Sequence, residues 1–358
     1  MKVLLVTILM VAFLNCEDVG GFFQNELRAL IQSRVWDVNI LRCNVQRSNI
    51  CPHSDVILRM YTTINRFGTY MDVKNPISLY LAGYDKHHET VFLIHGFNGT
   101  ERDKHMMYLR DAYLSRDYNV VTVDWKPLTQ YPCYLTALTN LKLAAQCSAQ
   151  IYSYLTYHGA SRETVTCVGH SLGAHICGMM SNHLTKRQFR IIGLDPARPL
   201  IERVQSKAFR LSEEDATHVQ IIHTNAGYLG QMDNPGHLNY CINGGRYQPY
   251  CKGHAIKRSR CSHFLSVCYL ANAIFKHKKF LGIPCPGGCV GLDGPNKLPV
   301  QVMHRKYSPN KYKGFLKEYK MGNDASDNLR GIYCLEVDYA KHCPFTDRYK
   351  REFILHHG

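Results

Sequence analysis

Residues 164–180, with the sequence TVTCVGHSLGAHICGMM, constrain the fold of this chain more than any other segment. An apolar, β-branched run ends at Gly169, a serine lies between two glycines, and a helix-compatible stretch follows. In a G-x-S-x-G turn the glycines let strand and helix pack closely, while the serine takes a strained backbone above a sheet. The motif also arises by chance, but its flanking patterns favour a nucleophile elbow with Ser171 as the nucleophile. The reaction class that it predicts is acyl transfer to water.

Runs typical of strands recur along the chain, and several precede helix-compatible stretches. They cover residues 56–63, 77–81, 90–94, 120–123, 165–168, 191–194 and 219–222, with a closing strand at 331–337. The clearest helix covers 135–155, between two of these strands. This alternation predicts an α/β fold with a central, mostly parallel sheet and helices on both faces.

The N-terminus has the pattern of a secretory signal peptide. Residues 1–16 combine an early lysine, an apolar run and small or polar residues. Residues 17–50 have no clear period and are interpreted as an N-terminal extension, followed by one catalytic domain at 51–345 and a tail at 346–358. No later segment is apolar over the length that a membrane helix needs. We expect a secreted, extracellular monomer.

Cysteine usage favours an oxidising compartment. Removal of residues 1–16 leaves 14 of the 15 cysteines, an even number suited to disulfides. Cys285 and Cys289 are expected to form a local pair. Their spacing also resembles a zinc clip, but no second clip stands at a useful distance. We expect no metal and no other cofactor.

The chain is strongly basic, with a formal charge of +15 and a pI near 9.1. Basic residues concentrate at 252–260, 276–279 and 305–320, the last two groups interspersed with aromatic residues. Such a surface attracts anionic lipid, heparin-like glycans or nucleic acid, although a solvated basic face without a partner is the more frequent explanation. Secretion makes nucleic acid the least expected partner.

A serine nucleophile needs an imidazole base and a carboxylate to orient it. In α/β-hydrolases these follow in the order Ser, Asp, His. Asp195 ends the apolar run 189–194, where the end of a strand would bring it beside the elbow. Asp124 also ends a strand, but it precedes the serine and is interpreted as structural.

Six histidines after Asp195 are candidates for the base: His218, His223, His237, His254, His263 and His277. We favour His263, because Cys261 and Cys268 flank it and disulfides could hold its loop still. His223 is better explained as a packed histidine at the end of a strand.

Two backbone amides are expected to form the oxyanion hole. One belongs to Leu172, directly after the nucleophile and at the start of a helix. The other belongs to Phe97, in the loop after strand 90–94, where Gly96 lets the backbone turn. Asn98 begins the glycosylation pattern Asn-Gly-Thr, but a glycan there would crowd the site, so we expect it to be unused.

The chain resembles the animal pancreatic-lipase family, and within it the secreted phospholipase A1 enzymes of arthropods, including those of wasp venoms. The resemblance runs from about residue 51 to about 337. It rests on IHGF at 94–97, DW at 124–125, GHSLGAH at 169–175, GLDPARP at 193–199, IHT at 222–224 and CSH at 261–263. It implies an α/β-hydrolase fold with Ser171, Asp195 and His263 as the triad, and with Phe97 and Leu172 as the oxyanion hole.

The resemblance also implies a lid closed by a disulfide between Cys251 and Cys261. The nine residues 252–260 are fewer than in the triacylglycerol lipases of the family, and the loop 226–237 is also short. Four lid residues are basic, which favours a phosphate: Lys252, Lys257, Arg258 and Arg260. A trimmed loop without a substrate role is the other explanation.

The resemblance has further implications for a disulfide, a second domain and a calcium site. Cys51 and Cys133 align with a disulfide of the venom-type relatives. The chain after His263 has no room for the family's lipid-binding β-sandwich, so no colipase is expected. The family's calcium loop is only partly matched, because Ser212 stands between Arg210 and Asp215 where an aspartate is expected.

These patterns favour a phospholipase A1 that acts on a phospholipid membrane or lipid aggregate and releases the sn-1 fatty acid. A triacylglycerol lipase or galactolipase is the neighbouring hypothesis. A non-catalytic, yolk-type binder is the hypothesis from another class, but such proteins lose the nucleophile and Ser171 is present.

Overall fold

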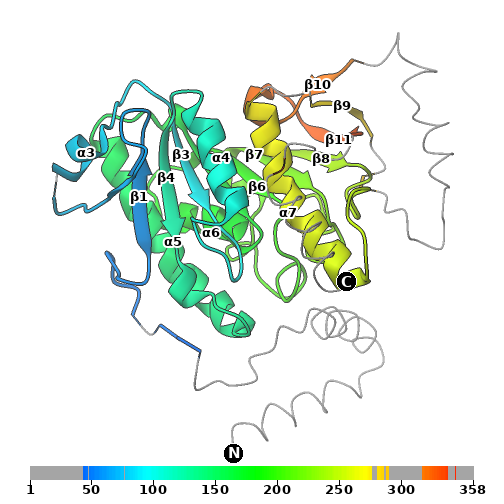
Figure 1. The fold of residues 1–358 in the computed structure, drawn as a ribbon, viewed down its shortest axis with the longest axis horizontal. Coiled ribbons are helices and arrows are strands. Elements are labelled where there is room, and N and C mark those ends of the chain that lie inside the picture. The colour runs from blue at the N-terminus through cyan, green and yellow to red at the C-terminus, as the bar shows by residue number, and fades with distance from the viewer. Residues whose placement is uncertain are drawn as a thin grey trace, which may run out of the picture.

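The computed structural model describes residues 43–46, 48–75, 77–275, 280–285, 288–289, 317–337 and 343. In this part of the chain one sheet of 11 strands runs through the molecule, with helices along it (Figure 1). The predicted signal peptide, most of the N-terminal extension and the tail at 346–358 lie outside the described residues. So do the basic residues at 276–279 and 305–313.

The strands lie in the order β10-β9-β11-β8-β7-β6-β5-β3-β4-β1-β2. Seven neighbouring strands are parallel: β11 (Gly331–Leu335), β8 (Leu238–Ile242), β7 (Ala216–His223), β6 (Gln188–Leu194), β5 (Val165–His170), β3 (Thr90–Ile94) and β4 (Asn119–Asp124). The edges are antiparallel: β1 (Ile57–Tyr61) and β2 (Thr69–Tyr70) on one side, β9 (Leu281–Pro284) and β10 (Tyr319–Lys320) on the other. The mostly parallel sheet predicted from the sequence is confirmed.

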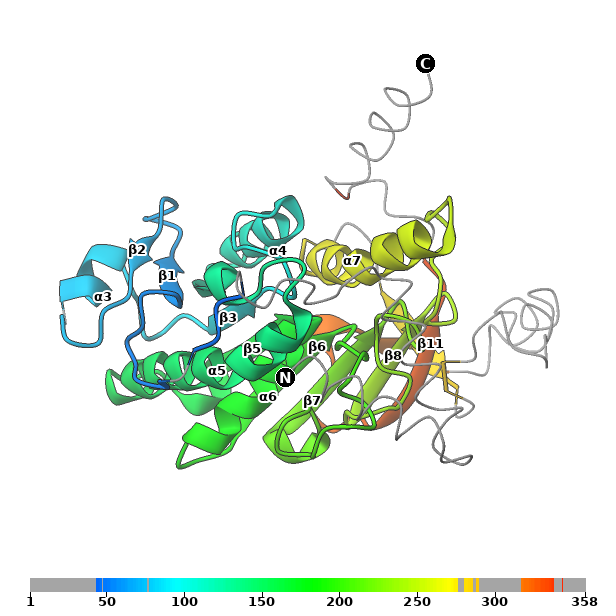
Figure 2. The same cartoon turned by 90° about the horizontal axis from the view of Figure 1, so that it is seen from below.

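Helices cover both faces of the sheet, as predicted (Figure 2). One layer contains α4 (Lys104–Leu114) and α7 (Ala255–Ile274), and the other contains α5 (Tyr134–Tyr157) and α6 (Leu172–Met180). Successive residues of β3 enter different cores: Val91 and Leu93 pack in the cluster of α4 and α7, Phe92 and Ile94 in that of α5 and α6. A parallel strand covered on both faces is apolar throughout, which explains why TVFLI does not alternate with polar residues.

Short 3-10 turns connect several elements, at Lys126–Leu128, Arg162–Thr164, Ser181–His183, Glu213–Asp215 and Gly322–Asp324. The strand predicted at 77–81 is wrong, because this segment forms helix α3 (Ile77–Ala82). The Asn75 side chain accepts the Ile77 amide at 3.1 Å, which starts a helical turn, and Gly83 ends it with a φ of 68°. Strand β8 was not predicted.

Seven disulfides join all 14 cysteines of the described residues: Cys43–Cys133, Cys51–Cys147, Cys167–Cys177, Cys241–Cys289, Cys251–Cys261, Cys268–Cys343 and Cys285–Cys334. The pair Cys251–Cys261 is confirmed. The pair Cys51–Cys133 is wrong, because Cys51 reaches Cys147 on α5 and Cys133, just before α5, reaches Cys43.

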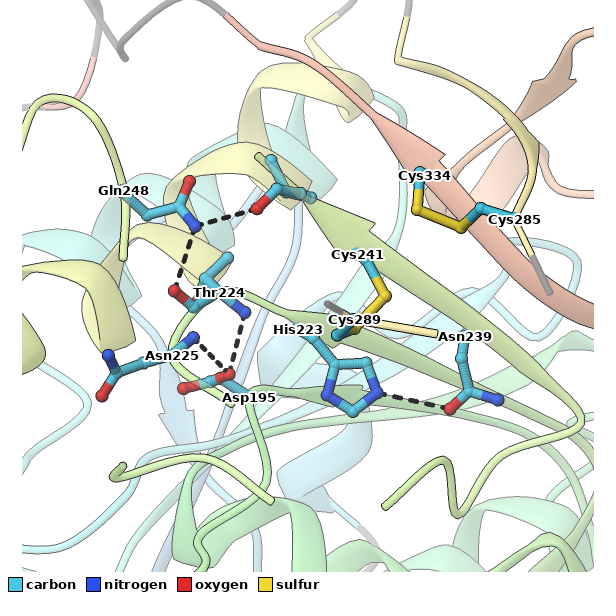
Figure 3. Close-up of a disulfide and its surroundings, with 11 residues drawn as sticks. Asp195, His223, Thr224, Asn225, Asn239, Cys241, Gln248, Cys285, Cys289 and Cys334 are labelled. Atoms are coloured by element: carbon cyan, nitrogen blue, oxygen red, sulfur yellow. Dashed lines mark hydrogen bonds between the residues drawn. A yellow bond between two sulfur atoms is a disulfide. The ribbon is translucent and has the colours of Figure 1, made fainter. Parts of the chain in front are cut away.

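The predicted local pair Cys285–Cys289 is also wrong. Strands β9 and β11 are neighbours, which puts Cys285 beside Cys334, and Cys289 reaches Cys241 of β8 (Figure 3). Pairing across strands depends on the sheet order, which the spacing of cysteines does not reveal. None of the helices that the structure describes is both long and apolar enough to cross a membrane.

Candidate active site

Ser171 lies in a sharp turn between β5 and α6, with φ 57° and ψ −120°. A Cβ on Gly169 would lie 2.2 Å from the Gly173 carbonyl oxygen, and one on Gly173 would lie 2.2 Å from the Ile94 carbonyl oxygen. Both obstacles are backbone atoms that cannot rotate away. Glycine is therefore required on both sides of the serine, as the elbow motif predicts.

Hydrogen bonds from neighbouring segments hold this turn in place. The Ser171 amide donates to the Leu194 carbonyl at 3.0 Å, and the Ser171 carbonyl accepts from Ala174 and Ala197 at 3.1 and 3.2 Å. A backbone of this conformation costs about 1–3 kcal/mol and persists only where the surrounding structure fixes it. The disulfide Cys167–Cys177 adds a covalent link between β5 and α6, on either side of the turn.

Asp195 follows β6 and is completely buried. Its Oδ1 accepts the amides of Thr224 and Asn225, both at 2.9 Å, which fixes the carboxylate in one orientation (Figure 3). Its Oδ2 accepts a hydrogen bond from His263 Nδ1 at 2.6 Å. Gly230 packs directly against this carboxylate, since a Cβ at position 230 would lie 2.4 Å from Asp195 Oδ1.

His263 belongs to helix α7 and not to a loop, so that part of the prediction is wrong. The flanking cysteines are nevertheless bridged, Cys261 to Cys251 and Cys268 to Cys343. Disulfides on both sides of His263 fix the helix, and they provide the rigidity that we expected from a disulfide-held loop.

Ser171 and His263 line the same cavity, which has a volume of about 450 Å³. Its wall also includes Gly96 and Phe97, and a Cβ on Gly96 would lie 2.6 Å from the Ser171 Cβ. Among the described residues, no acceptor takes the amide of Phe97 or of Leu172. The loop after β3 therefore runs against the serine, and two N–H groups are without an acceptor in the described part of the chain: that of Phe97 in this loop and that of Leu172 at the start of α6.

Two further histidines surround His263. The His170 ring lies 4.5 Å from that of His263, and its Nε2 donates to the His263 carbonyl at 3.2 Å. Burial, and then the charge of His263, hold the pKa of His170 well below its usual value. Burial likewise lowers the pKa of His105, which also lines the cavity, to about 3. Both neighbours are neutral and polar at physiological pH.

Comparison with known protein families decides the assignment. Residues 27–287 match the family model described as Lipase. The chain belongs to the lipase family.

The relatives of this lipase-family chain include wasp enzymes. A phospholipase A1 of Vespula maculifrons is 35% identical over 208 residues, which is 54% of this chain and 68% of that protein. "Phospholipase A1 2" of Vespa affinis is 30% identical over 67% of this chain and 76% of its own length. Lipase member H-A of Xenopus laevis is 30% identical, over 64% of this chain and 52% of its own.

Solved structures add little to the lipase assignment. A serine hydrolase homologue from Coxiella burnetii matches with a TM-score of 0.34 and 14% identity, over 53% of this chain and 84% of that chain. The fold assignment therefore rests on the sheet itself and on the family match.

The lid predicted for this lipase begins as a loop and continues as the first turns of α7. Ala255, Ile256, Ser259 and Arg260 line the cavity, together with His263 one turn further along. Lys252 is exposed, and Lys257 and Arg258 are half-buried. Helix α7 therefore contains both part of the predicted lid and the candidate base His263.

Asp124, interpreted from the sequence as structural, forms a separate pair with His95. Its Oδ1 lies 3.2 Å from His95 Nε2, and its Oδ2 accepts from Thr100 Oγ1 at 2.6 Å. Burial pushes the pKa of Asp124 upward, but hydrogen bonds from His95, Thr100 and Lys126 outweigh it and bring the pKa down to about 2. This pair braces the start of the 95–99 loop.

The other described histidine candidates do not line the cavity that contains the serine. His223 is buried at the end of β7, 3.4 Å from Asn239 Oδ1, and burial lowers its pKa (Figure 3). His218 packs on Phe189, His237 accepts the Val219 amide, and His254 occupies the N-cap position of α7 without a capping hydrogen bond from its side chain. His277 lies outside the described residues.

Sequence reasoning missed Gln248, a buried side chain behind the Asp195–His263 pair. Its Nε2 donates to the carbonyls of Thr224 and Ile242 at 3.0 Å each (Figure 3). Its Oε1 accepts from Tyr269 Oη on α7, also at 3.0 Å. Gln248 thus connects the loop that holds Asp195 to the helix that carries His263. No motif marks it, because a lone glutamine has no sequence signature.

In the loop that aligns with the family's calcium site, hydrogen bonds within the protein already engage the Asp215 carboxylate. Asp215 Oδ2 accepts from the Ser212 amide at 2.8 Å within a capping box, and Arg210 donates to the Glu202 carbonyl. Within the described ranges no three acidic, histidine or cysteine side chains are grouped to hold a metal. Burial raises the pKa of Asp215 to about 6, against the hydrogen bonds from Ser212.

Proposed function

We propose that this chain is a phospholipase A1, which hydrolyses the sn-1 ester of glycerophospholipids through an acyl-enzyme on Ser171. The observation that carries the proposal is the buried Asp195–His263 pair beside a serine elbow that shares its cavity. The wasp relatives, which bear the name phospholipase A1, support the substrate class.

In the proposed reaction His263 Nε2 accepts the Ser171 proton as Oγ attacks the ester carbonyl. Asp195 holds the imidazole through Nδ1 and stabilises the imidazolium that forms. The amides of Phe97 and Leu172 donate to the developing oxyanion, a contribution of about 3–4 kcal/mol per donor in comparable sites. The protonated His263 then releases the lysophospholipid alcohol, and a water molecule frees the fatty acid by the reverse route.

We further propose that the protein acts outside the cell and binds peripherally to lipid surfaces. The seven disulfides support an oxidising compartment. The basic lid supports attraction to phospholipid headgroups, and the phospholipase and lipase relatives support lipid substrates.

The test is hydrolysis of phospholipids with distinguishable acyl chains at sn-1 and sn-2, beside a triacylglycerol and a galactolipid. We expect sn-1 release, and a loss of several orders of magnitude in Ser171→Ala. Release of the sn-2 chain, or activity on the triacylglycerol alone, contradicts the proposal. Failure to react with a fluorophosphonate probe would indicate a non-catalytic binder.

A further inference from the structure

Arg260 gives the mouth of the cavity a permanent positive charge. It is exposed on the lid segment of α7 and lines the cavity together with Ser171 and His263. No carboxylate lines the cavity in the described part of the chain, and none of the described acidic residues pairs with Arg260. An anionic group that enters here meets a guanidinium that no described carboxylate neutralises.

Two more arginines flank this mouth in an alternating stack with two tyrosines. Arg258 of the lid lies over the Tyr247 ring at 4.1 Å, and Arg246 lies over the Tyr228 ring at 4.9 Å. The centroids of the two tyrosine rings lie 4.4 Å apart with the rings tilted by 37°, and both residues line the cavity. The stack Arg246–Tyr228–Tyr247–Arg258 therefore joins the loops after β7 and β8 to the lid.

This stack determines what the tyrosines can bind. A quaternary ammonium group is held in proteins by open aromatic faces that surround the cation. Here a guanidinium group already lies over each ring, and each ring also packs against the other tyrosine. A choline group would meet rings that already contact guanidinium groups, and two positive charges in addition to Arg260. A headgroup without a positive charge meets no such repulsion.

We propose that this mouth selects anionic glycerophospholipids, such as phosphatidylglycerol, over zwitterionic phosphatidylcholine, with Arg260 as the contact to the phosphate. The inference rests on the proposed phospholipase A1 function and names the headgroup class of that same site. Arg258 and Arg246 act from the rim by excluding a cationic headgroup.

The experiment compares kcat/KM for dihexanoyl phosphatidylglycerol and dihexanoyl phosphatidylcholine, both below their critical micelle concentrations. Monomeric substrates remove the attraction of a basic protein to an anionic vesicle, which would otherwise imitate headgroup selection. We expect the full-length enzyme to favour phosphatidylglycerol by about tenfold. In Arg260→Gln this ratio should fall to about twofold or less, with an unchanged melting temperature because the side chain is exposed.

Arg66→Gln is the matched control, because it removes the same charge from an exposed site. Arg66 follows β1, which runs antiparallel to β4, so it lies at the end of the sheet opposite to Ser171. Its ratio should equal that of the wild type. The proposal is overturned if the wild type favours phosphatidylcholine, if Arg260→Gln keeps the ratio, or if Arg66→Gln lowers it equally. Hydrolysis of a triacylglycerol but of neither phospholipid overturns the proposed function instead.

Discussion

His263 Nδ1 lies 2.6 Å from Asp195 Oδ2, and this hydrogen bond joins helix α7 to the end of strand β6. Sixty-eight residues separate the two along the chain. Both side chains are buried, so the contact is shielded from water and from salt. It is the contact that distinguishes Asp195 from the other aspartate that ends a strand, Asp124.

The substitution Asp195→Asn should lower kcat by about 10³–10⁴-fold with little change in KM, because the amide favours the wrong tautomer of His263. Asp124→Asn is the matched control. It weakens the pair with His95 and should destabilise the protein while kcat stays within about tenfold. Steady-state kinetics with melting temperatures would check both. The assignment fails if Asp124→Asn loses more kcat than Asp195→Asn.

The disulfide Cys167–Cys177 should matter more for catalysis than for stability. It closes a span of only 10 residues around Ser171, whereas Cys51–Cys147 closes a span of 96. Chain-entropy arguments give a loss of about 3 kcal/mol for the short span and about 5 kcal/mol for the long one. We expect Cys167→Ala/Cys177→Ala to lose kcat because the strained elbow relaxes, and Cys51→Ala/Cys147→Ala to lose more melting temperature but keep kcat. Equal kcat in the two double variants would contradict a positioning role.

Asp215 should make stability depend on pH. Burial raises its pKa in the folded protein to about 6, above the ordinary 3.8. A carboxyl group whose folded pKa is raised stabilises the fold fully below about pH 4, and this contribution is lost as the pH rises through 6. The loss amounts to at most about 3 kcal/mol. Urea unfolding at several pH values should show that Asp215→Asn gains stability relative to wild type between pH 4 and 6. A constant difference across this range would contradict the prediction.

Calcium should have no effect on stability through the 210–215 loop, because Ser212 and Asp215 satisfy each other there. An ion that bound only the folded state would raise the melting temperature with its concentration. We expect the same melting temperature in a chelator and in millimolar calcium. A rise with calcium that Asp215→Asn abolishes would show that the loop binds the ion.

The layered fold and the elbow could be predicted because they depend on local chemistry. The apolar run of β3 indicates a strand buried on both faces. Gly169 and Gly173 indicate positions where neighbouring backbone leaves no space for a side chain. Helix α3 could not be predicted from its apolar residues, because a short apolar run fits either secondary structure. The local signal for a helix was a single hydrogen bond from the Ile77 amide to the Asn75 side chain.

The sequence by itself determined a parallel α/β sheet, a serine elbow, and Asp195 and His263 as candidate partners, since residue order and composition carry that information. Only the tertiary structure decided that His263 stands on a helix, which cysteines pair, and that Gln248 ties the helix to the Asp195 loop. These features depend on which segments contact each other in the folded protein. Strand order and helix packing determine those contacts. Both result from the burial of apolar surface over the whole chain, which no local sequence pattern contains.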